Sequence, residues 1–168
     1  MLDIAENSIE AGASYIQIKI VEDLKKDLLK IEIVDDGKGM DPSIGRKALD
    51  PFFTTKTVRK VGLGLSLFQE AARTAGGELV MQSQAGQGTR VTATFQRSHL
   101  DRKPLGDMAR TMTALIIGHA DIRFAYSHRK NSRKCQFDTK DIGAGSDRSL
   151  ISIIEIKNLI EQNWREML

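Results

Sequence analysis

This sequence of 168 residues has one cysteine and no apolar run near the ~20 residues that a bilayer span requires. The lone Cys135 excludes an internal disulfide and is typical of a reducing compartment. The N-terminus lacks the charged and then apolar pattern of a secretory signal. We therefore expect a cytoplasmic protein that has no membrane partner.

A strong charge of either sign is also absent, since 25 basic and 22 acidic residues give a net charge of +3. The sequence combines this weak positive charge with no motif that reads the grooves of DNA, so nucleic acid is not an expected partner. The segment "RFAYSHRKNSRK" is basic with interleaved aromatics, as some nucleic-acid surfaces are. On a hairpin, alternation alone would turn the aromatics inward and the charges to solvent. With 40% hydrophobic residues and neither repeats nor low-complexity tracts, the chain is long enough to bury its own core.

The first stretch, "LDIAENSIEAGA", predicts a short amphipathic helix that ends near Gly12. Asp3 and Asn7 are four residues apart and therefore lie one above the other on a helix, away from its apolar side. One interpretation is an ordinary surface helix whose acids favour the positive end of the helix dipole. The other is an asparagine that ligates a hard cation beside an acid that orients water.

Alternating patterns predict two pairs of strands and a helix within residues 1–96. Strands 14–23 and 28–36 are joined by a polar turn, and strands 78–84 and 89–96 by the turn "AGQG". The spacing of leucine and alanine predicts a helix over 63–75, which Gly76 and Gly77 end. The chain begins almost inside its first expected helix, so we expect this unit to be shortened at its N-terminus.

Residues 97–168 predict a separate accessory module in the order α-β-β-α. Pro104 can open a helix over 104–118, and a hairpin is expected across Lys130, Asn131 and Ser132. An amphipathic helix over 151–168 closes the chain. We expect this module to dock on the first unit or on a partner protein.

Two glycine-bearing motifs flank a long polar stretch. "DDGKGM" (35–40) follows an apolar strand, where glycines let the backbone lie against a flat ligand and Asp35 can accept a hydrogen bond from an exocyclic amine. "GLGLS" (62–66) opens a helix whose backbone amides favour phosphate oxygens. Taken singly, the first motif is also typical of an ordinary hairpin turn, and the second motif is also typical of an ordinary helix start.

In this order the motifs resemble those of the GHKL ATPases, the family of DNA gyrase, the large heat-shock chaperone, MutL and the histidine kinases. "AENSIEAGA" is similar to the MutL version of the N box, while "PFFTTK" and "VGLGLSL" are similar to the histidine-kinase lid and glycine box. The resemblance implies an α+β Bergerat fold, a sandwich of a mixed sheet with helices on one face. It also implies binding of ATP and Mg²⁺.

The resemblance also implies site residues. Asn7 would ligate the magnesium, Asp35 would accept from the adenine amino group, and Thr89 would assist Asp35 through a water. Phe53 would pack in the lid and Lys56 would contact phosphate. The full set of expected nucleotide contacts is Asn7, Asp35, Gly37, Gly39, Met40, Phe53, Lys56, Gly62, Leu63, Gly64 and Thr89.

Three departures leave the activity open. Asp3 stands where MutL-like members place a catalytic glutamate, so it is the expected general base although it is one methylene shorter. Lys60 replaces a glycine of the kinase pattern, and there is no acceptor histidine of the kinase type. We expect a slow ATPase or a protein kinase; the alternatives are a nucleotide-gated binding module without turnover and, less favoured, a MutL-like DNA repair ATPase. A protein partner would bind through 97–168, and a homo-oligomer is compatible with the sequence.

Overall fold

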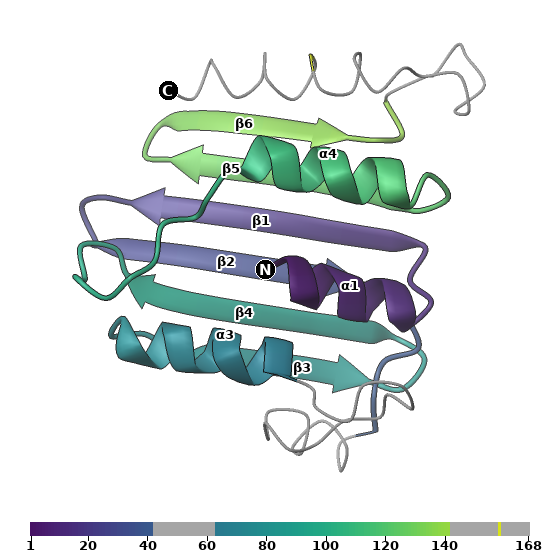
Figure 1. Cartoon of the computed structure of the whole chain (residues 1–168), viewed down its shortest axis with the longest axis horizontal. Coiled ribbons are helices and arrows are strands. Elements are labelled where there is room, and N and C mark those ends of the chain that lie inside the picture. The colour runs from purple at the N-terminus through teal and green to yellow at the C-terminus, as the bar shows by residue number, and fades with distance from the viewer. Residues whose placement is uncertain (42–62, 142–157, 159–168) are drawn as a thin grey trace.

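The computed structural model describes residues 1–41, 63–141 and 158. Each described helix is followed along the chain by two strands, in the arrangement of Figure 1. The elements are α1 (Leu2–Glu10), β1 (Tyr15–Asp23), β2 (Leu28–Asp35), α3 (Leu63–Thr74), β3 (Leu79–Gln84), β4 (Gly88–Gln96), α4 (Met108–Gly118), β5 (Arg123–Lys130) and β6 (Arg133–Asp138).

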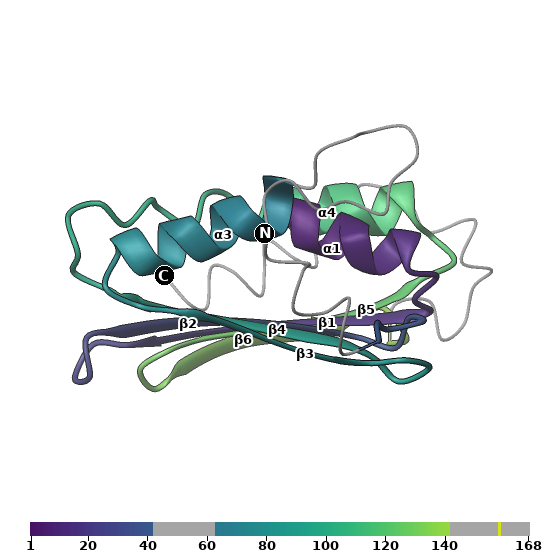
Figure 2. The ribbon, with the colours of Figure 1, turned by 90° about the horizontal axis from the view of Figure 1, so that it is seen from below.

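All six strands form one mixed sheet in the order β3-β4-β2-β1-β5-β6. β1 and β5 run parallel, and the other neighbours are antiparallel. Figure 2 shows α1, α3 and α4 together on one side of this sheet. The expected α/β sandwich with a mixed sheet and helices on one face is therefore confirmed. None of the described helices is long and apolar enough to cross a bilayer.

The strands form where side chains alternate between apolar and polar. Along β1, Ile16, Ile18 and Ile20 are buried, whereas Gln17 and Lys19 between them stay partly exposed. β2 repeats the pattern in antiparallel register, with Ile18 opposite Ile33. One face of the sheet thus carries the core and the other carries polar groups.

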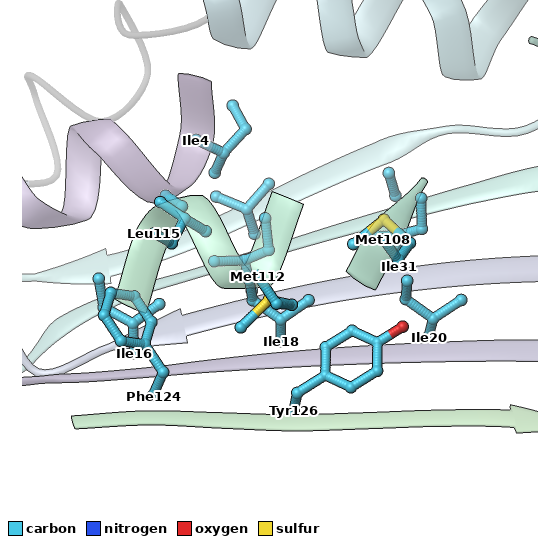
Figure 3. Packing of buried hydrophobic residues seen from close by; sticks show 14 of the residues in the cluster. Ile4, Ile16, Ile18, Ile20, Ile31, Met108, Met112, Leu115, Phe124 and Tyr126 are labelled. Atoms are coloured by element: carbon cyan, nitrogen blue, oxygen red, sulfur yellow. The ribbon is translucent and has the colours of Figure 1, made fainter. Parts of the chain in front are cut away.

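Helix α4 covers part of the core and lies over β5 (Figure 1). Its Met108, Met112 and Leu115 are at most 2% exposed and point toward the isoleucines of β1 and toward Phe124 (Figure 3). The helix begins at Asp107, whose side chain accepts a hydrogen bond from the backbone N–H of Arg110 at 2.9 Å. Burying each of these side chains contributes roughly 1.5–3 kcal/mol.

The hairpin β5–β6, which the sequence assigns to the accessory module, continues the sheet of residues 1–96. β5 lies beside β1 over eight paired residues, from Tyr15 opposite Arg123 to Glu22 opposite Lys130. The turn uses Asn131 at φ 54°, and the Asn131 side chain accepts from the backbone N–H of Leu24 at 3.1 Å. The expected last helix lies outside the described residues apart from Asn158, and the division into two units stays a prediction.

Candidate functional site

A row of polar side chains crosses the helix-covered face at one end of the sheet. Asp35 is the last residue of β2, and its register partners run through Thr89 of β4 to Ser83 of β3. On the other side the same row continues into Ile16 of β1, which is fully buried. The polar groups therefore border the apolar core directly.

The Asp35 carboxylate is buried and held by three donors. Its Oδ1 accepts from the backbone N–H groups of Gly37 at 3.0 Å and Thr89 at 3.2 Å. Its Oδ2 accepts from Ser8 Oγ at 2.6 Å. A carboxylate offers about four acceptor positions, so this arrangement leaves one for a further donor. The side chain is fixed and retains an acceptor, as recognition of an amine requires.

Ser8 belongs to this site although sequence reasoning did not select it. It lies on the buried side of α1 at 4% exposure, and the Ile4 carbonyl oxygen, 3.3 Å from its Oγ, is the alternative acceptor for its single hydroxyl proton. A serine among the apolar positions of a helix needs a partner, because a buried unpaired hydroxyl is costly. That position in the helix was the available signal.

The next hydroxyls in the row form a second set of hydrogen bonds. Thr89 Oγ1 and Ser83 Oγ are 2.9 Å apart, and Ser83 Oγ accepts from the Met40 backbone N–H at 2.8 Å. Thr89 therefore reaches Asp35 through its backbone and Ser83 through its side chain. The segment that leads away from β2 is thereby attached to the β3–β4 hairpin.

Glycine is required where this segment crosses the hairpin. Gly39 has φ +61°, and a side chain there would collide with the carbonyl of Gln84. Gly37 is close to Ala11, so an added Cβ would lie 3.0 Å from the Ala11 Cβ atom. The backbone of 37–39 is in this way packed between α1 and the β3–β4 turn.

Asp36 attaches the end of β2 to the start of β1. Its carboxylate accepts from Ser14 Oγ at 2.6 Å and from the backbone N–H groups of Ser14 and Tyr15 at 2.8 Å. Burial by itself would raise the pKa of Asp36, but these hydrogen bonds outweigh it and hold the pKa below its ordinary value. Asp36 thus fixes the strand end while Asp35 faces the helices.

Asn7 and Asp3 share one side of α1, as expected. Asn7 is partly exposed and follows directly before Ser8, so it lies one residue from the partner of Asp35. Asp3 is exposed and lies against the start of α3, where a Cβ added to Gly64 would be 2.7 Å from the Asp3 Cβ. The structure therefore brings Asp3 and Gly64 together.

Part of the expected site lies outside the described residues. Phe53, Lys56 and Gly62 belong to 42–62, and Leu63 begins α3 without a described side chain. Within the described residues, no group of three or more His, Cys, Asp or Glu side chains suits a metal ion. The expected oxygen ligand for a cation is Asn7, which fits the preference of Mg²⁺ for one or two protein oxygens.

Two hollows among the described residues lie away from this row. One, near Lys26 and Gly76, contains only one acid, Asp27, whose carboxylate already accepts from Ser98 and Gln96. The other lies on the opposite face of the sheet beside Gln17. We place the candidate site at Asp35, because its carboxylate is fixed and buried, whereas the Asp27 carboxylate accepts as many hydrogen bonds in a more exposed position.

Comparison with known proteins agrees with this geometry. The family model described as histidine kinase-, DNA gyrase B-, and HSP90-like ATPase matches residues 1–99. The chain belongs to this ATPase family. Membership of the GHKL family supports ATP binding and a role of the kinase or ATPase type. Asp35, Ser83 and Thr89 all lie within the matched residues.

Bacterial sensor kinases are among the similar curated proteins. The sensor protein kinase FleS of Pseudomonas aeruginosa is 37% identical over 92 residues, which cover 55% of this chain and 23% of FleS. A putative sensor histidine kinase, NtrY-like, of Rickettsia conorii is 29% identical over 103 residues, covering 61% of this chain and 17% of that protein. The chain thus spans less than a quarter of the length of these relatives.

A solved structure shares the fold. The N-terminal domain of a DNA repair protein superposes with a TM-score of 0.56 at 18% identity. The superposition covers 80% of this chain and 49% of that one. At this identity the likeness concerns the fold alone.

Proposed function

We propose that this GHKL domain binds Mg·ATP at the Asp35 end of the sheet and passes the γ-phosphate to water or to a partner protein. The observation that carries the proposal is the Asp35 carboxylate, which is fixed by Ser8, Gly37 and Thr89 and keeps one acceptor position. An exocyclic amine such as that of adenine is the donor that fits it. The buried side chain of Ile16, next to this polar row, offers an apolar surface for the base.

The phosphates would extend toward α1 and the start of α3. Asn7 would supply an oxygen to Mg²⁺, whose chemistry here is to neutralise phosphate charge. The first turn of α3, with Gly64 at Asp3, presents backbone N–H groups and the positive end of a helix dipole. α3 has no acid in its first turn, so none of its own side chains repels an anion there.

Asp3 would act on the nucleophile. Its carboxylate accepts the proton of an attacking water or acceptor hydroxyl as the new O–P bond forms and the bond to the β-phosphate oxygen breaks. The exposure of Asp3 favours a second candidate, a module that binds ATP and signals to a partner without turnover.

The test follows γ-labelled ATP with magnesium in wild type, Asp3→Asn and Asp35→Asn. We expect label to appear as free phosphate or on a protein, with Asp3→Asn slowed by about 10²-fold or more at unchanged ATP affinity. Glu6→Gln is the matched control on α1 and should turn over like wild type. Label that stays in ATP while ATP binds would favour the second candidate, and equal ATP affinity in Asp35→Asn would contradict the pocket.

A further inference from the structure

The face of the sheet opposite the helices has its own charge pattern. Every second residue of each strand points to this side, as Gln17 and Lys19 do between the buried isoleucines of β1. All the described helices lie on the other side of the sheet (Figure 2). We call this surface the open face; Asp35 and Ser8 are not part of it.

Cations outnumber carboxylates on the open face of the described strands. By strand alternation and register, its carboxylates are Asp23, Glu32 and Asp138. Its cations are Lys19, Lys30, Arg90, Arg123, Arg129 and Lys134. The whole chain carries only +3, so positive charge is concentrated here.

The single negative charge of Glu32 cannot neutralise the positive charges of the side chains around it. Lys19, Lys30 and Arg90 approach its carboxylate at 3.7, 3.3 and 3.1 Å, so three cations share one negative charge. Burial by itself would raise the pKa of Glu32, yet Lys30 and Arg90 outweigh it and keep the pKa below its ordinary value. The Glu32 side chain is 12% exposed, whereas that of Arg90 is 45% exposed. The surface that a partner would contact at this point is therefore positively charged.

Arg129 and Lys134 make the pattern stronger at the β5–β6 hairpin. They are direct register partners and both are exposed. Like charges directly opposite one another destabilise a strand pair. No ion pair relieves either of them within residues 1–41 and 63–141. An external carboxylate would relieve this repulsion.

Apolar side chains lie between the cations. Val21 stands between Lys30 and Arg129 in the register, and Val34 stands beside Arg90. A hollow of about 380 Å³ opens next to them, lined among others by Gln17, Ser127 and Gln136. Small apolar contacts surrounded by charge are the pattern of a protein interface with a polar rim.

We propose that the open face docks the acidic, amphipathic surface of a partner protein. A second copy of this face is disfavoured, since it would bring cations against cations. Nucleic acid is disfavoured because the described strands place one aromatic ring, Tyr15, on this face, and the Arg123 guanidinium already lies 4.8 Å from its centroid. The proposal stands independently of the nucleotide site, which is on the other side of the sheet.

The test uses a fluorescent 20-residue helical peptide with leucine on one side and glutamate on the other, titrated with the full chain. We expect Arg129→Glu together with Lys134→Glu to weaken binding by at least about tenfold, and Val21→Ser to weaken it less. Raising salt from about 0.05 to 0.3 M should also weaken binding. Arg129→Gln with Lys134→Gln tests the same pair by neutralisation.

The matched control is Lys25→Glu with Lys26→Glu, which changes the net charge equally but lies in the exposed β1–β2 turn outside the open face. It should keep most of the wild-type affinity, and circular dichroism checks that each variant folds. The proposal is overturned if wild type does not bind the peptide, or if the Lys25/Lys26 double variant loses as much affinity as the Arg129→Glu, Lys134→Glu double variant. It is also overturned if a 20-nucleotide single-stranded DNA binds to the wild type more tightly than the peptide does.

Discussion

Two buried polar clusters lie on the helix-covered face, at opposite ends of β1 and β2. At one end Asp35 joins Ser8 and Thr89, and at the other Glu22 of β1 joins His128 of β5. Both interrupt an apolar surface, and both depend on residues far apart in sequence. They differ in the backbone and the side chains that surround the carboxylate.

The Glu22 cluster joins protein groups to one another. Glu22 Oε1 is 3.0 Å from His128 Nε2, and Oε2 accepts from Arg97 Nε at 3.2 Å. His128 Nδ1 is 3.3 Å from the Tyr126 hydroxyl, and both residues are at most 3% exposed. Burial raises the pKa of Tyr126 well above its ordinary value, so its hydroxyl stays protonated.

The Asp35 cluster is different because it is bordered by glycines. The backbone at Gly37 and Gly39 packs closely against Ala11 and Gln84, whereas Glu22 is bound by the side chains of His128 and Arg97. A buried polar group by itself therefore does not indicate a ligand site. A fixed carboxylate beside closely packed glycine backbone is the more specific indication.

Gly39→Ala should have the largest effect on the Asp35 end. A Cβ there meets the Gln84 carbonyl and the residue must keep φ +61°, so we expect a loss of several kcal/mol in the free energy of unfolding and loss of ATP binding. Gly86→Ala is the matched control, since φ is +75° but no atom lies within 4 Å of the added Cβ. It should cost about 1 kcal/mol. Urea unfolding measures both variants. Equal losses in the free energy of unfolding for Gly39→Ala and Gly86→Ala would show that the close contact at Gly39 is unimportant.

Met112→Ala tests whether the C-terminal half is part of the same folded unit. Met112 is fully buried over the sheet, so the change should cost about 2–5 kcal/mol in one cooperative transition that includes the ATP site. Ile117→Ala on the same helix, 40% exposed, should stay within about 0.5 kcal/mol of wild type. Two separate unfolding transitions would instead support independent units.

The Glu22 cluster predicts a pH dependence of stability. Burial lowers the pKa of His128 more than its hydrogen bond to Glu22 raises it, with Lys130 also lowering it. Below about pH 6.5 the unfolded chain takes up a proton that the folded chain resists, so stability falls as the pH falls, by at most about 1.4 kcal/mol per unit. Urea unfolding at several pH values should show a flatter profile for His128→Gln. A wild-type stability that rises toward pH 5 would contradict this sign.

Ser8→Ala should have the smallest effect. It removes one of the three donors to Asp35 and leaves the other two, so ATP affinity should fall about tenfold, or ~1.4 kcal/mol. Ser8→Thr keeps the hydroxyl and is the conservative comparison. Calorimetric titration with ATP measures both variants, and wild-type affinity in Ser8→Ala would remove Ser8 from the site.

Local patterns predicted most of the elements. Alternation gave β1, β2 and the β5–β6 hairpin, and the helix expected over 63–75 is α3 at Leu63–Thr74. The motif order predicted the ATPase family. These features are local because strand alternation, turn residues and helix ends depend on neighbours in sequence.

Long-range pairing was not predictable in the same way. Nothing in the local pattern of residues 123–130 specifies that they lie parallel to β1, because strand alternation does not name the partner. The hydrogen bond from Ser8 to Asp35 likewise joins residues 27 apart. Sequence reasoning therefore treated 97–168 as an accessory module, whereas its hairpin extends the sheet.

The measurement that tests the central claim most directly is titration of ATP with magnesium into wild type, Asp35→Asn and Asp138→Asn. Asn keeps the size of Asp but puts an NH₂ group where the carboxylate accepts from Ser8, Gly37 and Thr89. We predict that Asp35→Asn loses ATP binding by more than about 100-fold. Asp138→Asn, on the open face and paired with Arg123, should bind like wild type. Wild-type affinity in a folded Asp35→Asn would show that the nucleotide binds elsewhere.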